Sequence, residues 1–293
     1  MFRGVLVPLA TPFGEAGELR LDAFCRNLER YLEAPLTGFV VAGTTGEGLH
    51  LSADERLELV AACARILPVD RALLAGVPAQ SLPEAVEFAD RLGDDRLDGL
   101  LVTVPSYYRN RMTREALRDY FLALAERVAV PIFLYNIPQL TGIELPVSVV
   151  QELAAHPNIA GMKESSGNLI YLQEILGAVA QSDFQLMSGS AETFAFARQL
   201  GIEAAILGAS CIIPDMLARH GDRAGRPDAD FRAVQADIVR LSSVVVRGLG
   251  IAGIKCAMDV RGFEGLHCRR PLGSLTETER ARVRAIMEQI DPQ

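Results

Sequence analysis

The sequence predicts a (β/α)8 barrel, the TIM-barrel fold class, followed by a C-terminal all-helical extension. Short apolar runs recur at intervals of about 25 to 35 residues, which is the spacing of β/α units. The runs are continuous rather than alternating, as in parallel strands that are buried on both faces. Eight such runs alternate with helical patterns, and eight is the number of strands that closes this barrel.

The predicted strands are the apolar runs that end in small or polar residues. They are Val5–Ala10, Gly38–Ala42, Ala72–Val77, Gly99–Val104, Pro131–Tyr135, Ile159–Lys163, Phe184–Ser188 and Ala204–Gly208. A doubly wound open sheet is the competing architecture, and a Gly-x-Gly-x-x-Gly motif after the first strand would favour it. That motif is absent from the sequence.

The segments between the runs carry helix signals. Leu21–Leu32 is amphipathic, and Ser52-Ala-Asp-Glu55 is a capping box at the start of the next helix. Ser81 and Thr113 begin two further helices, with Pro83 tolerated in a first turn. The remaining barrel helices are expected at 148–155, 169–179 and 192–200.

After about residue 212 the strand pattern stops and only helical patterns follow. Helices are predicted from a start at Arg226–Asp230 through Val246, around Gly253–Val260, and over Thr276–Ile290. We therefore expect a barrel with the functional site over residues 1–224 and a C-terminal helical domain over residues 225–293.

Composition argues against several classes of protein. The net charge of −8 is spread along the chain without a basic patch, so nucleic acid and anionic membranes are poor partners. No apolar stretch is long enough to span a bilayer, and no signal-peptide pattern is present. The five scattered cysteines contain no Cys-x-x-Cys, which indicates reduced thiols in a cytoplasm. The four His residues form no metal-binding pair.

Lys163 stands out because lysine is rare in this chain. Of 29 basic residues only Lys163 and Lys255 are Lys, and the others are Arg. An ammonium group can lose its proton when it is desolvated and attack a carbonyl, whereas a guanidinium stays charged. Lys163 also ends an apolar run, in Ala160-Gly-Met-Lys-Glu-Ser-Ser166. An ordinary solvated cation is the alternative interpretation.

In barrels of this class the reacting groups come from the carboxyl ends of the strands. The residues at those ends are mainly hydroxyls, phenols, glycines and one amine. They lie at 11–12, 43–47, 105–108, 135–138, 163–165, 188–190 and 208–210. No cluster of metal ligands is among them, which favours covalent imine chemistry over Lewis-acid chemistry and predicts no metal or other cofactor.

Three of these segments have a functional and a structural interpretation. In Gly43-Thr-Thr-Gly-Glu47 the glycines let backbone N–H groups converge and the Thr hydroxyls add donors, which suits a carboxylate, although a plain β-to-α turn is common. Tyr135 at a strand end beside Lys163 is well placed for proton transfer, or is a buried core phenol. Tyr107-Tyr108 is more typical of packing or of an interface than of catalysis.

Together these motifs resemble the dihydrodipicolinate synthase / N-acetylneuraminate lyase family of pyruvate-dependent class I aldolases, over essentially the whole chain. The resemblance is carried by four segments. They are Gly43-Thr-Thr-Gly-Glu47, Tyr135-Asn-Ile-Pro138 with Thr141-Gly142, Gly161-Met-Lys-Glu-Ser-Ser-Gly-Asn168, and Gly253-Ile-Lys255.

The resemblance implies a (β/α)8 barrel with a C-terminal helical domain, assembled as a homotetramer that is a dimer of dimers. It implies that Lys163 forms a Schiff base with pyruvate or a 2-keto acid and that Tyr135 moves the proton at the aldol oxygen. The other implied residues act around these two. Thr44 belongs to a hydroxyl relay with a Tyr of a neighbouring subunit, which is Tyr108 or, as the reserve, Tyr107. Thr45 and Gly46 hold the carboxylate of the keto acid. Gly189 contributes backbone near the imine, and Lys255 is structural.

The residues expected to bind the second substrate, the aldehyde, depart from the synthase pattern. Dihydrodipicolinate synthases carry Arg two residues after the Pro of the Tyr-Asn-x-Pro motif, where it binds the carboxylate of the aldehyde partner. Here that position is Leu140, which looks more like the sialate lyases and keto-deoxy sugar acid aldolases. The acidic residues after the seventh strand are also altered, to Ser188-Gly-Ser-Ala-Glu192.

The first hypothesis is therefore a class I aldolase that reversibly cleaves a 2-keto-3-deoxy sugar acid to pyruvate and an aldehyde. The runner-up is 4-hydroxy-tetrahydrodipicolinate synthase, which condenses pyruvate with aspartate semialdehyde. N-acetylneuraminate lyase and a hydratase-aldolase follow. A barrel that binds a keto acid without turning it over is the hypothesis from another class.

Overall fold

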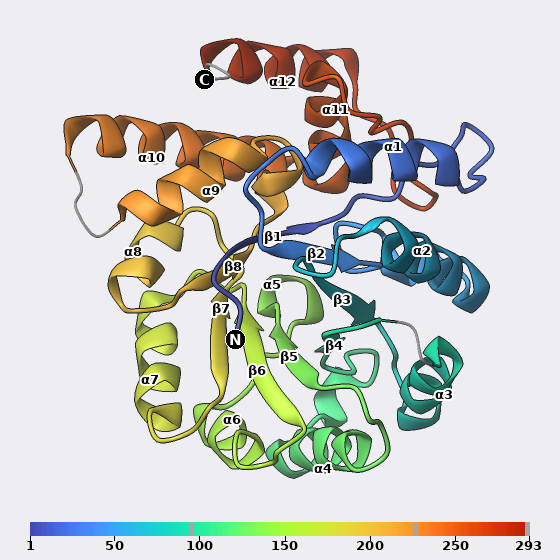
Figure 1. Cartoon of the computed structure of the whole chain (residues 1–293), viewed down its shortest axis with the longest axis vertical. Helices are drawn as coiled ribbons and strands as arrows, with labels where there is room; N and C mark the ends of the chain where they lie inside the picture. Colours follow the sequence, from blue (N-terminus) through green and yellow to red (C-terminus); the bar gives the residue numbers. More distant parts are fainter. Residues whose placement is uncertain (94–95, 225–227, 291–293) are drawn as a thin grey trace.

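The structure is a closed barrel of eight parallel strands in sequential order, surrounded by helices, with further helices after the barrel (Figure 1). It is a computed structural model that describes residues 1–93, 96–224 and 228–290. The predicted fold class is confirmed. The doubly wound alternative is wrong, because β1 pairs with β8 as well as with β2 and thereby closes the sheet.

The eight strands lie where the apolar runs predict them, with ends that shift by one or two residues. They are β1 (Gly4–Pro8), β2 (Gly38–Val41), β3 (Ala72–Val77), β4 (Gly99–Thr103), β5 (Ile132–Asn136), β6 (Ile159–Glu164), β7 (Gln185–Ser188) and β8 (Ala204–Ile206). The run at Ala204–Gly208 is longer than its strand, since Gly208 already begins a 3₁₀ turn, η3 (Gly208–Cys211).

The barrel helices follow the predicted signals. They are α1 (Leu21–Tyr31), α2 (Ala53–Ile66), α3 (Leu82–Leu92), α4 (Arg114–Ala125), α5 (Pro138–Thr141), α6 (Val147–Leu153), α7 (Leu169–Val179), α8 (Phe194–Gln199) and α9 (Pro214–Arg223). Ser52 caps α2 in a complete capping box with Glu55. The exceptions are α5 and α9, which no sequence signal predicts. α5 is a single turn, and α9 follows the point where the strand pattern ends.

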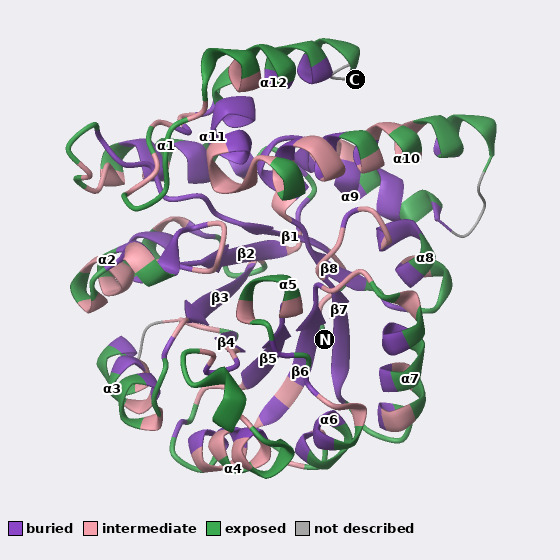
Figure 2. Ribbon diagram, turned by 180° about the vertical axis from the view of Figure 1, so that it is seen from behind, coloured by how far each residue is buried: buried purple, intermediate pink, exposed green. Residues whose placement is uncertain are grey.

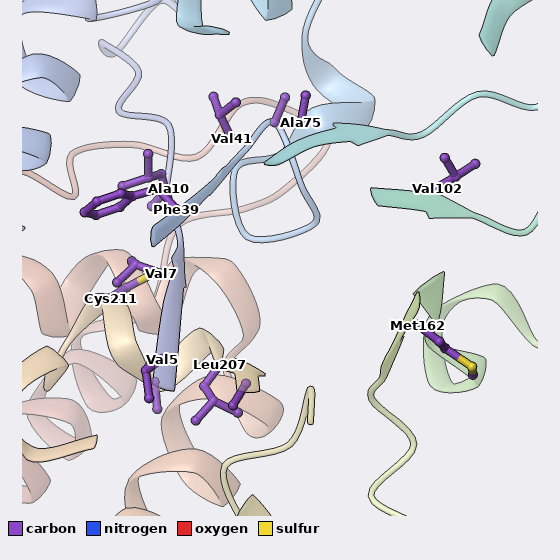
Figure 3. Packing of buried hydrophobic residues seen from close by; sticks show 14 of the residues in the cluster. Val5, Val7, Ala10, Phe39, Val41, Ala75, Val102, Met162, Leu207 and Cys211 are labelled. Carbon is purple, nitrogen blue, oxygen red and sulfur yellow. The ribbon is translucent and has the colours of Figure 1, made fainter. Parts of the chain in front are cut away.

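The core has two layers, one on each face of the closed sheet. Inside the barrel, alternate residues of the strands pack together, among them Leu6, Val40, Leu74, Leu101 and Phe133. Their neighbours along each strand point outward and pack against the helices, as Val5, Val7, Phe39 and Val41 do in Figure 3. Figure 2 shows the strands buried and the outer faces of the helices exposed. This double burial explains the continuous apolar runs.

The C-terminal region consists of α10 (Ala229–Leu241), a π-helix η4 (Ser242–Gly248), α11 (Gly250–Val260) and α12 (Glu277–Gln289). The helix start predicted at Arg226 and the domain boundary predicted at residue 225 lie outside the described residues. Asp228 caps α10 by accepting a hydrogen bond from the amide of Phe231. Among the described residues, no helix combines the length and the apolar character needed to cross a bilayer.

Candidate active site

Lys163 lies inside the barrel near the carboxyl end of β6. Its neighbours in register are Tyr135 of β5 and Met187 of β7, so the three side chains share the inner face of the sheet. The side chain is 6% exposed, and Nζ lies 4.2 Å from the centre of the Tyr135 ring. Within the described part of the chain no carboxylate forms an ion pair with Lys163. A desolvated amine without a counter-ion is the form suited to attack a carbonyl.

Tyr135 joins Lys163 to the loop that follows β2. The phenol is 3% exposed, and its hydroxyl is 3.3 Å from Oγ1 of Thr44. This contact connects the ends of β2 and β5 across the mouth of the barrel. A proton accepted by the phenol can pass to Thr44 without leaving the site, which is the arrangement that general acid–base catalysis needs.

The loop Gly43–Glu47 presents unused backbone donors. The amides of Thr44, Thr45 and Gly46 donate no hydrogen bond to any described residue, whereas those of Glu47 and Gly48 close the turn onto Thr44 and Gly43. The carbonyl of Gly46 accepts a hydrogen bond from Oγ1 of Thr11 at 2.7 Å, which orients the turn. Consecutive free amides of this kind form an anion-binding concavity.

Thr45 lies above the end of β8. A Cβ built on Gly208, just after this strand, would be 3.9 Å from Oγ1 of Thr45. The predicted carboxylate-binding loop and the predicted imine lysine therefore belong to the same end of the barrel. Their roles as ligand groups stay predictions.

Gly189 and Ser165 meet between the ends of β6 and β7. A Cβ on Gly189 would come within 1.8 Å of Oγ of Ser165, so only glycine fits there. The Gly189 amide donates to the carbonyl of Glu164 at 2.6 Å. Oγ of Ser165 is buried and has no hydrogen-bond partner among the described residues. The sequence analysis placed Ser165 at a strand end but assigned it no role, and its unpaired hydroxyl makes it a candidate ligand group.

Glu164 follows the lysine but faces the other way. Its Oε1 accepts hydrogen bonds from the amide of Ser166 at 2.6 Å and from Nδ2 of Asn136 at 3.2 Å. Burial raises the pKa of the Glu164 carboxyl, and the hydrogen bonds from Ser166 and Asn136 act in the opposite direction. Oδ1 of Asn136 in turn accepts from the amide of Leu145 at 3.1 Å, which anchors the loop that carries α5.

Leu140 lies on α5, at the mouth of the barrel. The helix is held against the end of β6 by a hydrogen bond from Nε2 of Gln139 to the carbonyl of Ser165. Leu140 is 66% exposed. Arg109, from the loop after β4, lies against Gly142 at the end of α5, where a Cβ would be 2.5 Å from Nη1. Among the described residues Arg109 has no acidic partner. A free cation therefore lies close to the position at which the synthases carry Arg.

Tyr107 and Tyr108 are not brought to Thr44 within one chain. They are 81% and 68% exposed, and their rings pack edge to face with centres 5.0 Å apart. The loop is fixed by Oε1 of Gln80, which accepts hydrogen bonds from the amides of Ser106 and Tyr107. In the described residues no hydrogen bond joins either phenol to Thr44.

The C-terminal region contacts the loop that follows β7, a contact that no sequence pattern indicates. Glu192, after β7, accepts a hydrogen bond from Oγ of Ser243 at 2.9 Å and pairs with Arg247 at 3.1 Å. Both partners belong to the π-helix η4. π-Helical turns occur often at functional sites. Among the described residues, no group of three His, Cys, Asp or Glu side chains could hold a metal ion.

Three comparisons with known proteins identify proteins that this chain resembles. The model of the dihydrodipicolinate synthetase family matches residues 1–290. The 4-hydroxy-tetrahydrodipicolinate synthase of Methanosarcina barkeri is 32% identical over 287 residues, which cover 97% of this chain and 96% of the relative. The structure of the Acinetobacter baumannii dihydrodipicolinate synthase with pyruvate has a TM-score of 0.92 at 26% identity, over 98% of both chains.

A 2-keto-3-deoxygluconate aldolase from Sulfolobus sulfataricus, solved with D-KDPG, shares the fold as well. Its TM-score is 0.88 at 22% identity, over 98% of this chain and 95% of the other. This chain thus shares its fold both with a synthase and with a sugar acid aldolase.

We predict that Lys163 is the residue that forms the imine. Incubation with pyruvate and borohydride should add one reduced pyruvate per chain, and a peptide map should place it on Lys163, because this amine is buried without a counter-ion. Lys163→Ala should abolish the adduct in a protein that still folds. A map that places the adduct on Lys255 would refute the assignment.

We further predict that Tyr135→Phe lowers kcat by roughly 10²–10⁴, the usual contribution of general acid–base catalysis. The substitution keeps the ring beside Lys163 and removes only the hydroxyl that contacts Thr44. Pyruvate trapping by borohydride should therefore suffer less than C–C cleavage. An unchanged kcat would return Tyr135 to a packing role.

Proposed function

From the premise that the chain belongs to the dihydrodipicolinate synthetase family of pyruvate-dependent class I aldolases, we propose that it reversibly cleaves a 2-keto-3-deoxy sugar acid to pyruvate and an aldehyde. The observation that carries this proposal is Leu140, an apolar side chain on α5 where the synthases bind a carboxylate.

In the proposed reaction the amine of Lys163 condenses with the keto carbon and water leaves. The protonated imine is an electron sink. The hydroxyl two carbons away gives its proton to the Tyr135 oxygen while Tyr135 passes its own proton to Thr44, a C=O bond forms there, and the C–C bond breaks to leave an enamine on Lys163. Protonation of the enamine and hydrolysis release pyruvate. The free amides of Thr44, Thr45 and Gly46 hold the carboxylate of the keto acid throughout.

Leu140 disfavours a second carboxylate. Aspartate semialdehyde carries one, and a bidentate Arg is the geometry that satisfies it. Leu140 offers that carboxylate no donor, so the charge-assisted hydrogen bonds that an Arg would supply, worth about 1.5–3 kcal/mol each, are missing. A polyhydroxylated aldehyde demands less, because its hydroxyls can bond to neighbouring Ser, Thr and Tyr side chains or to water. Ser165, with its unpaired hydroxyl, supports the same choice.

The second candidate is 4-hydroxy-tetrahydrodipicolinate synthase, and one structural observation favours it. Arg109 lies against Gly142, two residues from Leu140, and has no acidic partner among the described residues. It is a substitute cation for the missing Arg. The relatives at 28–32% identity are also named as this synthase.

We predict at least a tenfold lower kcat/KM for the synthase reaction than for cleavage of a keto-deoxy sugar acid, since about 1.4 kcal/mol is a factor of ten. Leu140→Arg should raise synthase activity. The measurement is kcat/KM for both reactions in the wild type, Leu140→Arg, Arg109→Met and the double variant. Efficient synthase activity that is lost in Arg109→Met would establish the runner-up.

We also propose a homotetramer, and two exposed surfaces support it. The first is the Tyr107–Tyr108 pair, whose rings pack together and are largely exposed, as in side chains that become covered at an interface. The second is an apolar groove between α7 and α8, lined by Leu169, Ile170, Phe196 and Leu200. Two separate self-contacts make a dimer of dimers.

The free thiols of all five cysteines support a cytoplasmic location.

If Tyr108 completes the site of a neighbouring subunit, mixing two inactive variants should restore activity. Tyr108→Phe chains retain Lys163, and Lys163→Ala chains retain the phenol, so mixed assemblies contain some complete sites. The activity of the mixture is compared with that of each variant alone. A phenol that acts within its own chain gives no rescue, and a fully active monomer contradicts the proposal.

A further inference from the structure

Glu47 ends the carboxylate-binding loop in a strained backbone conformation. Its φ is 54°, in the left-handed region, and Ala42 on the other side of the loop has the same value. Such angles are unfavourable for residues other than glycine, and they persist only where surrounding contacts enforce them. The free amides of Thr44, Thr45 and Gly46 lie between these two residues.

The contacts that enforce the turn come from the far end of the chain. The Glu47 carboxylate is fully buried, and its Oε1 is 2.6 Å from Nζ of Lys255 in α11. Oε2 accepts a hydrogen bond from the amide of Arg269 at 2.9 Å and lies 3.2 Å from Nδ1 of His50. Each carboxylate oxygen is therefore bound by a segment beyond residue 250.

Lys255 is itself held in place by burial and by a second hydrogen bond. Its side chain is 1% exposed, and Nζ also donates to the carbonyl of His267 at 2.6 Å. The ammonium lies 4.7 Å from the centre of the Phe13 ring, in the loop after β1. Burial lowers the pKa of Lys255, and the carboxylate of Glu47 opposes that effect. The two lysines of the chain thus differ: within the described residues Lys163 has no carboxylate partner, whereas Lys255 pairs with Glu47 and also donates to His267.

The packing around the pair leaves no room for adjustment. A Cβ on Gly48 would lie 2.0 Å from the carbonyl oxygen of Ala42, so the two ends of the loop are in backbone contact. A Cβ on Gly265 would lie 2.1 Å from the carbonyl oxygen of Lys255. Close backbone contacts therefore surround both Glu47 and Lys255.

We propose that Glu47 and Lys255 are positioning residues, whose buried ion pair lets the C-terminal region hold the Thr44–Gly46 turn in the shape that binds the keto-acid carboxylate. The inference rests on the proposed function in one respect, that this turn binds the carboxylate. A pair that only stabilises the fold would change the unfolding temperature and leave keto-acid binding in the folded enzyme unaltered.

The test uses pyruvate as the probe and borohydride trapping as the readout, well below the unfolding temperature of each protein. Lys255→Met and Glu47→Gln should each raise the half-saturating pyruvate concentration at least tenfold, with a maximal trapping rate within about threefold of the wild type. The double variant should be no worse than the more affected single variant, because both changes break one contact. Arg26→Met, which breaks the exposed Arg26–Glu264 pair to the same C-terminal segment, should leave the half-saturating concentration unchanged.

Half-saturation within twofold of the wild type in both single variants would overturn the inference, as would effects that multiply in the double variant. Where Lys255→Met fails to fold, Glu47→Asp carries the same expectation, because it keeps the charge and shortens the reach by one methylene. Failure of the underlying premise, that this chain binds pyruvate as an imine, has a different signature: the wild type then traps no pyruvate at all.

Discussion

The parallel register between β5 and β6 is the constraint on which the site depends. It sets Tyr135 beside Lys163 on the inner face of the barrel, so the phenol and the amine meet without any loop rearrangement. Closure of the barrel then brings the loop after β2 close enough for Thr44 to contact the same phenol. Groups from three strands converge because parallel strands present all their carboxyl ends at one mouth.

Strand alternation separates charges that the sequence places side by side. Glu164 is adjacent to Lys163, yet it points out of the barrel and binds Asn136 and the amide of Ser166. Among the described residues no carboxylate pairs with the amine of Lys163, while the carboxylate of Glu164 orders the loop that carries α5. The two neighbouring residues therefore face different surroundings.

The C-terminal helices contribute more than a cover for the barrel. Ser243 and Arg247 of the π-helix contact Glu192 after β7, and Lys255 binds Glu47 at the end of the Gly43–Glu47 loop. None of these pairings follows from local sequence, because the partners are about 50 and 200 residues apart. The unpaired hydroxyl of Ser165 was missed for a related reason: its burial depends on Gly189 from the next strand.

The sequence by itself determined the barrel and its strands, because burial on both faces imposes continuous apolar runs and capping residues mark where helices begin. It also singled out Lys163, Tyr135 and the Gly43–Glu47 loop, since these lie at strand ends. It missed α9, where no strand follows to mark the unit. Only the tertiary structure decided which way each strand-end residue points, that the two tyrosines after β4 lie exposed, and that Arg109 lies beside α5. These features depend on packing between distant segments, and a local pattern carries no information about the segment that will lie opposite it.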